Sequence, residues 1–146
     1  MICGDLMKTD VVLCHENDPV RECARLMREH NVGFLPVVDA EDRVVGVVTD
    51  RDLATRIVAD PSRDCDTPVH RAMSLDLVTC AIEDDLEDVR AMMAKRKKSR
   101  IIAVDGERRC IGIISLSDIG QTDRPERTGE LLRAITRREV SASVSS

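Results

Sequence analysis

Residues 46–52 have the sequence Gly-Val-Val-Thr-Asp-Arg-Asp, and residues 112–118 have the sequence Gly-Ile-Ile-Ser-Leu-Ser-Asp. Each stretch passes from a short apolar segment to a hydroxyl residue that is followed three positions later by an acid. This order predicts a strand that continues directly into a helix, with the hydroxyl as N-cap and the acid in the first helical turn. We therefore expect a hydroxyl and a carboxylate together at the rim of each strand–helix junction.

The two stretches belong to a longer internal repeat whose offset is constant from beginning to end. The spacing that separates Gly46 from Gly112 also pairs Met7 with Met73 and continues to Asp118 without an insertion or deletion. A register that is kept over this length indicates a tandem duplication.

Each copy predicts the order extended segment, helix, strand, strand, helix, which gives an α+β chain of two βαββα repeats. In the first copy, Asp18 is the expected N-cap of the first long helix, with Pro19 at its first position. The expected elements of the first copy are an extended segment at 11–14, a helix at 20–30, strands at 34–38 and 44–48, and a helix at 50–59. In the second copy they are a helical turn at 69–73, an extended segment at 77–80, a helix beginning at 84–87, and strands at 100–104 and 110–114.

The predicted domain organisation follows this duplication. We expect the first repeat at 1–60, a linker rich in turn-forming residues at 61–68, and the second repeat at 69–121. The remaining 122–146 should contain a charged tail helix, from about Arg124 to Val140, and a disordered end from Ser141.

Composition excludes several classes of function. The formal net charge of −5 disfavours binding to nucleic acid or to a membrane surface, and Phe34 is the single aromatic residue, so platforms for base stacking are absent. There is neither a long apolar run nor a signal peptide, so the sequence predicts a cytoplasmic protein without a transmembrane span.

Six cysteines are many for 146 residues, but none forms a Cys-x-x-Cys pair. Cys14 and Cys80 are equivalent in the repeat, so a redox pair or a metal site with His15 is conceivable. Because no zinc-ligand spacing is present, we expect small buried thiols and no metal site. Cys3, near the end of the chain, is a candidate for an intermolecular thiol.

The acids at the two junctions have two interpretations. A carboxylate can accept hydrogen bonds from two neighbouring hydroxyls, which is the arrangement that a ribose presents. Alternatively, Thr49 and Ser115 only cap helices, and Asp52 and Asp118 only interact with the helix dipoles. The residues by themselves leave both interpretations open.

A family resemblance favours the first interpretation. Residues 33–39, Gly-Phe-Leu-Pro-Val-Val-Asp, precede the stretch at 46–53, and residues 99–105, Ser-Arg-Ile-Ile-Ala-Val-Asp, precede that at 112–119. In these motifs the chain resembles a tandem pair of cystathionine-β-synthase (CBS) domains, or Bateman module, of the stand-alone bacterial type. The resemblance implies repeats packed sheet to sheet about a pseudo-twofold axis, and commonly a homodimer.

The resemblance also implies a ligand. The clefts between such repeats bind adenosine-containing molecules, namely AMP, ADP, ATP, S-adenosylmethionine or NAD-like compounds. In that comparison the acids hold the ribose beside the hydroxyls, the valines line the base pocket, the strand backbones contact the adenine edge, and the arginine meets phosphate. The residues that match are Val12, Leu35, Pro36, Thr49 and Asp52 in the first repeat, and Val78, Arg100, Ile101, Ile102, Ser115 and Asp118 in the second.

The two copies differ at matched positions. Phe34 stands where the second repeat has Arg100, which Lys97 and Lys98 precede, and Ile102 stands where the first repeat has Pro36. The two sites should therefore not be equivalent, and we expect the more basic one to be the better nucleotide site.

These observations define three hypotheses. The first is a regulatory module that senses an adenosyl ligand and signals in trans to an effector protein, without an obligatory cofactor. The second is a ligand-free structural or interaction protein, such as a stress-associated dimeric assembly factor, in which Phe34 fills one cleft. The third, an enzyme, is disfavoured, because no nucleophile–base pair, metal cluster or Gly-rich phosphate loop is visible and no catalytic residue can be named.

Overall fold

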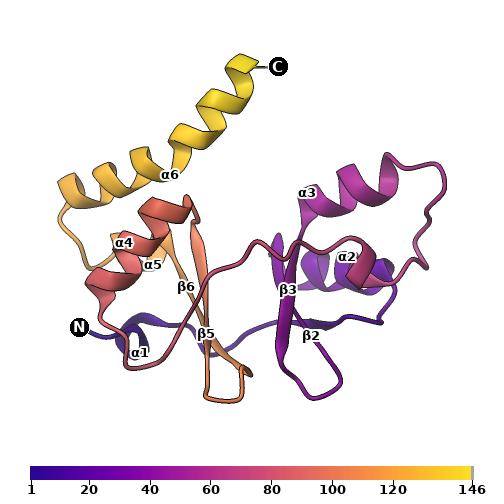
Figure 1. Cartoon of the computed structure of the whole chain (residues 1–146), viewed down its shortest axis with the longest axis horizontal. Coiled ribbons are helices and arrows are strands. Elements are labelled where there is room, and N and C mark those ends of the chain that lie inside the picture. The colour runs from indigo at the N-terminus through magenta and orange to yellow at the C-terminus, as the bar shows by residue number, and fades with distance from the viewer. Residues whose placement is uncertain (146) are drawn as a thin grey trace. The chain divides into compact units, whose positions relative to one another are not determined.

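The computed structural model describes the backbone of residues 1–145 and the side chains of residues 1–136. The chain divides into two compact units (Figure 1). The first-repeat unit comprises Asp10–Leu77 and Gly106–Cys110, and the second-repeat unit comprises Met1–Thr9, Val78–Asp105 and Ile111–Ser146.

The first-repeat unit is built on a three-stranded sheet in the order β1-β2-β3, in which β1 is parallel and β3 antiparallel to β2. The last strand continues directly into a helix, as the sequence predicted. The elements are β1 (Cys14–His15), α2 (Val20–His30), β2 (Phe34–Val38), β3 (Val44–Thr49), α3 (Asp50–Asp52), the π-helical η1 (Leu53–Val58) and the 3₁₀ turn η2 (Val69–Arg71).

The second-repeat unit has a sheet in the matching order β4-β5-β6; its strands β5 and β6 are labelled in Figure 1. It contains two further helices, one at each end of the chain. The elements are α1 (Cys3–Leu6), β4 (Thr79–Cys80), α4 (Leu86–Arg96), β5 (Arg100–Val104), β6 (Cys110–Ser115), α5 (Leu116–Gly120) and α6 (Pro125–Ser145). The mixed α+β fold expected from the sequence is confirmed.

Residues that match in the sequence repeat also have the same backbone conformation and strand pairing. Cys14 pairs with Val37 between β1 and β2, and the matched Cys80 pairs with Ala103 between β4 and β5. Left-handed residues also occur in matched pairs, because Asn31 and Lys97 end α2 and α4, and Asp42 and Arg108 lie in the two hairpins. The duplication therefore extends to strand register and turn conformation.

Each compact unit combines segments that are separated in the sequence. The segment Met1–Thr9 begins the first repeat in sequence, yet it belongs to the second-repeat unit, where Lys8 exchanges two backbone hydrogen bonds with Ile113 of β6. Ser74 of the second repeat exchanges the same two bonds with Val47 of β3 in the first-repeat unit. Each sheet is thus completed by the segment that leads into the other repeat.

Two glycines allow these segments to approach the strands closely. A Cβ atom at Gly46 would lie 2.9 Å from the Ser74 carbonyl oxygen, and one at Gly112 would lie 3.1 Å from that of Lys8. Because each segment crosses so close to the strand, the strand position beneath it has no room for a side chain.

Each unit has its own aliphatic core. In the first-repeat unit the core includes Leu35, Val37 and Val48, and in the second it includes Ile101 and Ile114. The second core also contains two residues of the tail helix, Leu131 and Ile135, so α6 is part of the fold. Burying such a side chain contributes about 1.5–3 kcal/mol.

Three local expectations differ from the structure. Pro19, and not Asp18, occupies the N-cap of α2, and the Asp18 carboxylate instead accepts a 3.0 Å hydrogen bond from the His15 N–H group. Cys3 is fully buried in α1, so the expectation of an accessible thiol there is wrong. Helix α6 passes the expected end at Val140 into the segment that was expected to be disordered, and residue 146 lies outside the described residues.

Within the part of the chain that the structure describes, no helix is both long enough and apolar enough to cross a bilayer.

Candidate functional site

The junction of β3 and α3 forms a reciprocal capping box. The Thr49 hydroxyl accepts a 3.1 Å hydrogen bond from the Asp52 N–H group, and the Asp52 carboxylate accepts a 2.9 Å bond from the Thr49 N–H group. This box fixes the side chain of Asp52 beside the hydroxyl of Thr49. Both side chains are half-buried, so they remain accessible from solvent.

The junction of β6 and α5 has the same box with additional hydrogen bonds. The Asp118 carboxylate accepts bonds of 2.9 Å from the Ser115 N–H group and 2.8 Å from its hydroxyl. The Asp118 N–H group donates to the Ser115 hydroxyl, which also lies 2.8 Å from that of Ser117. The predicted pairs Thr49–Asp52 and Ser115–Asp118 are therefore each brought together.

Each acid also faces a cation, but the two cations differ. Lys8 Nζ lies 3.2 Å from Asp118 Oδ1, and the carboxylate side chain is 5% exposed. At Asp52, which is 15% exposed, the nearest cation is Arg56, whose Nε atom lies 3.7 Å from Oδ1. Burial acts to raise the pKa of Asp118, but the hydrogen bonds from Ser115 and the Lys8 ammonium outweigh it, so the pKa lies below its ordinary value.

The positions expected to line the base pocket also differ. In the second-repeat unit the Ile102 N–H group donates a 3.1 Å hydrogen bond to the Val78 carbonyl. The matched residue of the first repeat is Pro36, which has no N–H group, so the Val12 carbonyl cannot receive the corresponding bond. The two matched carbonyls therefore differ in their strand partners.

The strand positions expected at the base divide into buried and exposed groups. Leu35 and Ile101 have fully buried side chains in the two cores, so only their backbone groups could contact a ligand. Phe34 lies opposite Thr49 in the β2–β3 ladder, and its matched residue Arg100 is exposed at the start of β5. The Leu116 N–H group donates to the carbonyl of the residue that precedes Arg100, which brings this arginine next to the Ser115 junction.

The buried cysteines form a pair within each unit. Cys14 and Cys23 in the first-repeat unit have Sγ atoms 3.3 Å apart, and Cys3 and Cys80 share a side-chain hydrogen bond in the second. The hydrogen bond to Cys23 and burial raise the pKa of Cys14, while burial and the bond to Cys3 raise that of Cys80. Such thiols stay protonated at neutral pH and behave as small apolar side chains.

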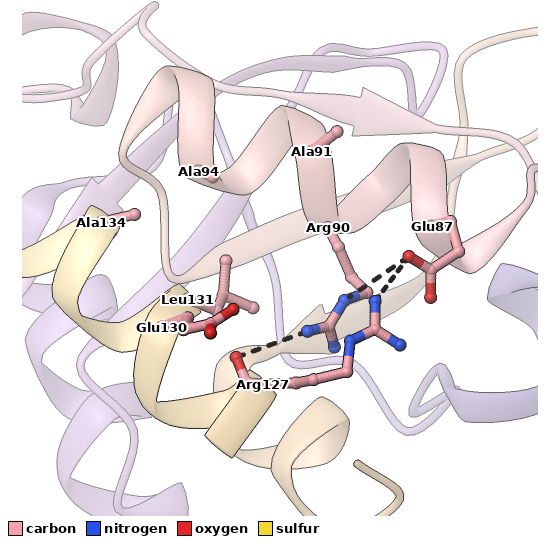
Figure 2. A pocket seen from close by; sticks show the side chains of 8 residues that line it. All are labelled: Glu87, Arg90, Ala91, Ala94, Arg127, Glu130, Leu131 and Ala134. Carbon is pink, nitrogen blue, oxygen red and sulfur yellow. Dashed lines mark hydrogen bonds and ion pairs between the residues drawn. The ribbon is translucent and has the colours of Figure 1, made fainter. Parts of the chain in front are cut away.

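The described residues contain no group of three or more histidine, cysteine or acidic side chains that could hold a metal ion. A groove of about 290 Å³ lies instead between α4 and α6 of the second-repeat unit (Figure 2). Arg90, which is largely buried there, donates to the Asp123 carboxylate and to the Arg127 carbonyl, and Arg127 binds Glu87 at 2.7 Å. The groove contains no residue of the predicted site, and its ion pairs join α6 to α4.

Sequence reasoning did not find Lys8. Its match in the other repeat is Ser74, so the internal alignment marks a charge difference at this position. The partner of that charge became evident only when the structure placed Met1–Thr9 on the second repeat.

A duplicated α+β chain with a hydroxyl–carboxylate capping box at each strand–helix junction is the architecture of a module built from two tandem domains. The chain belongs to the CBS domain family, whose model matches residues 3–59 and 69–120. A CBS domain pair is a regulatory module.

Among its relatives is the CBS domain-containing protein YhcV of Bacillus subtilis, 36% identical over 93% of this chain and 96% of that protein. The inosine-5′-monophosphate dehydrogenase of Methanocaldococcus jannaschii is 37% identical over 75% of this chain, which spans only 21% of that enzyme. A solved structure of similar fold is the CBS domain pair of protein MJ0100 in complex with 5′-methylthioadenosine and S-adenosyl-L-methionine. It is 25% identical, with a TM-score of 0.72, and the match covers 84% of this chain and 94% of that one.

Proposed function

We propose that this protein is a regulatory module that binds an adenosine-containing ligand through Asp52 and Asp118. Each carboxylate accepts the hydroxyls of a ribose, and each neighbouring strand backbone contacts the base. The ligand class comprises adenine nucleotides, S-adenosylmethionine and NAD-like compounds, and no obligatory cofactor is needed. The binding of adenosyl compounds by the CBS pair of MJ0100 supports this class.

One observation supports the proposal most directly. Both boxes hold an acid and a hydroxyl together at matched positions, so the geometry was kept on both sides of a duplication. The capping box accounts for both the hydroxyl and the acid as residues of a helix start. A carboxylate that faces a hydroxyl at the end of a strand also provides the acceptors that a diol requires.

Isothermal titration of the whole chain with adenosine, AMP, ATP, 5′-methylthioadenosine and S-adenosylmethionine tests the proposal. We expect binding of at least one of these ligands, and a loss of about tenfold or more in affinity per site when Asp52→Asn or Asp118→Asn removes a charged acceptor. Asp5→Asn is the matched control, because Asp5 also bonds the N–H group at a helix start but lies outside both junctions. Folded protein that binds no ligand of this panel at millimolar concentration would contradict the proposal.

We also propose that the module forms a homodimer and acts on an effector protein in trans. If the subunits can adopt two relative arrangements, the ligand shifts the equilibrium between them by no more than its difference in affinity for the two. Light scattering with and without ligand measures the assembly. The ligand-free interaction protein is the alternative. It predicts that Asp52→Asn and Asp118→Asn leave assembly and partner binding unchanged and that no titration shows heat of binding.

A further inference from the structure

Both oxygens of the Asp118 carboxylate have partners within the second-repeat unit. Its Oδ2 atom accepts from the N–H group and the hydroxyl of Ser115, and its Oδ1 atom lies 3.2 Å from the Lys8 ammonium. Only 5% of this side chain is exposed and Lys8 contacts its Oδ1 atom, so a ribose diol has to compete with Lys8 for this oxygen. A diol can therefore use Asp118 only if Lys8 gives up its contact.

The backbone of Lys8 is held by hydrogen bonds, while its side chain is largely exposed. Its N–H group donates to the Ile113 carbonyl at 2.9 Å, and its carbonyl accepts from the Ile113 N–H group at 3.0 Å. The side chain is 70% exposed, so the ammonium can reach a new partner without a change of the fold. An ammonium is a pure donor, so that partner has to be an acceptor, and an anion serves best.

At the first-repeat junction a serine stands at the position that matches Lys8. The matched residue, Ser74, makes the same pair of backbone bonds with Val47, but its hydroxyl accepts from the Asp76 N–H group at 3.1 Å. The nearest cation to Asp52 is Arg56, and its Nη1 atom donates to the Met73 carbonyl at 2.9 Å. Among the side chains that the structure describes, the cation at Oδ1 of Asp52 is therefore more distant, at 3.7 Å.

We propose that Lys8 selects the ligand charge at the second-repeat junction, an inference that rests on the proposed function. A ligand with an anionic group of the phosphate class takes the Lys8 ammonium and thereby frees Asp118 for its ribose. An adenosyl compound without such a group binds at Asp52 and is disfavoured at Asp118. The two junctions thus differ in ligand class: a phosphorylated adenosine in the second repeat, and an uncharged or cationic adenosyl compound in the first.

The test isolates the second junction in an Asp52→Asn background and compares titrations with AMP and with adenosine at low salt. In this background we expect AMP to bind at least about tenfold more tightly than adenosine. Adding Lys8→Met should weaken the binding of AMP and strengthen that of adenosine, each by about fivefold, because Met keeps most of the chain length and removes the charge. Lys95→Met is the control, since Lys95 is an exposed lysine on α4 of the same unit, and it should leave the ratio of the two affinities unchanged.

The possible outcomes separate this inference from the function on which it rests. An AMP-to-adenosine ratio that Lys8→Met does not change, or that Lys95→Met changes equally, overturns the role of Lys8 while the ligand class stands. If neither AMP nor adenosine binds the wild-type chain or any variant, the inference fails. The proposed function fails with it only if ATP, 5′-methylthioadenosine and S-adenosylmethionine do not bind either. Thermal unfolding of each variant shows whether Lys8→Met remains folded, as expected for an exposed side chain.

Discussion

The two strand–helix junctions share one local design in different surroundings. Thr49 with Asp52 and Ser115 with Asp118 form the same reciprocal box, and their strands have the same register. Their surroundings differ in three ways: the cation beside the acid, the strand hydrogen bond that Ile102 makes and Pro36 cannot, and the presence of helix α6 on the second-repeat unit. The comparison shows that a duplicated local motif is kept by its own short-range bonds, while long-range neighbours make the copies unequal.

The largest expected effect concerns an ion pair that one unit has and the other lacks. Arg90 binds the Asp123 carboxylate with both side chains mostly buried, whereas the matched residue on α2 is the exposed Ala24. Removing one partner leaves a buried charge unpaired, so Arg90→Met should lower the free energy of unfolding by about 3 kcal/mol. Urea denaturation at pH 7 measures this.

Arg25→Met on α2 is the matched control. Arg25 has ion pairs with Glu22 and Glu29, but all three side chains are substantially exposed. The expected loss is therefore about 0.5 kcal/mol or less. Equal losses for Arg25→Met and Arg90→Met would show that the buried pair does not distinguish the two units.

The next largest effect concerns the two glycines over which the segments at Ser74 and Lys8 pass. Gly46→Ala would place Cβ 2.9 Å from a backbone oxygen, and Gly112→Ala would place it 3.1 Å from one, so both should destabilise the fold. Overpacking of this kind costs about 1–3 kcal/mol, and Gly46→Ala should be the worse because its contact is tighter. Chemical denaturation of both variants provides the comparison. Gly106→Ala, at an open hairpin position, should change little.

A smaller effect depends on pH. The pKa of Asp118 is below its ordinary value in the folded chain, so its ionised form stabilises the fold above the unfolded pKa of about 3.9. That contribution is lost as the pH falls through the folded pKa. Asp118→Asn should therefore be less stable than wild type by about 1 kcal/mol at pH 7, and this difference should shrink as the pH falls below about 4.

Denaturant titrations from pH 7 to pH 3 measure the difference in the free energy of unfolding between wild type and Asp118→Asn. The same pair of measurements is made in a Lys8→Met background. Because Lys8 supplies part of the effect, Asp118→Asn should change the stability less in that background. A difference between wild type and Asp118→Asn that grows toward low pH would contradict the assignment.

The smallest effect concerns the matched left-handed residues. Asn31 and Lys97 end α2 and α4 with φ values of 53° and 56°. Asparagine tolerates this conformation better than lysine, so Lys97→Asn should stabilise the second-repeat unit by about 0.5 kcal/mol. The reverse change, Asn31→Lys, should destabilise by a similar amount in differential scanning calorimetry. A stabilising Asn31→Lys would show that the helix ends are not equivalent.

The local architecture could be predicted because its causes lie close together in the chain. Strand β3 and helix α3 follow from apolar residues beside Thr49 and Asp52, and the capping box joins residues three positions apart. The N-cap of α2 was less predictable, because Asp18 and Pro19 both favour a helix start and the Asp18 carboxylate bonded instead to His15.

The features of the site and fold that the sequence did not predict all depend on contacts between different helices and strands. The spacing between Cys14 and Cys23 crosses from β1 to α2, so no helical or strand period reveals that their sulfur atoms meet. The tail helix was expected from its pattern, but its burial against α4 required the position of Arg90 to be known.

The sequence by itself determined the duplication, the order of strands and helices in each repeat, and the acid–hydroxyl pair at each junction. Only the tertiary structure decided that Met1–Thr9 belongs to the second-repeat unit, and with it that Lys8 faces Asp118. The physical reason is range. Capping bonds and side-chain periodicity act within a few residues, whereas an ion pair between segments far apart in the chain exists only once the backbone has brought them together.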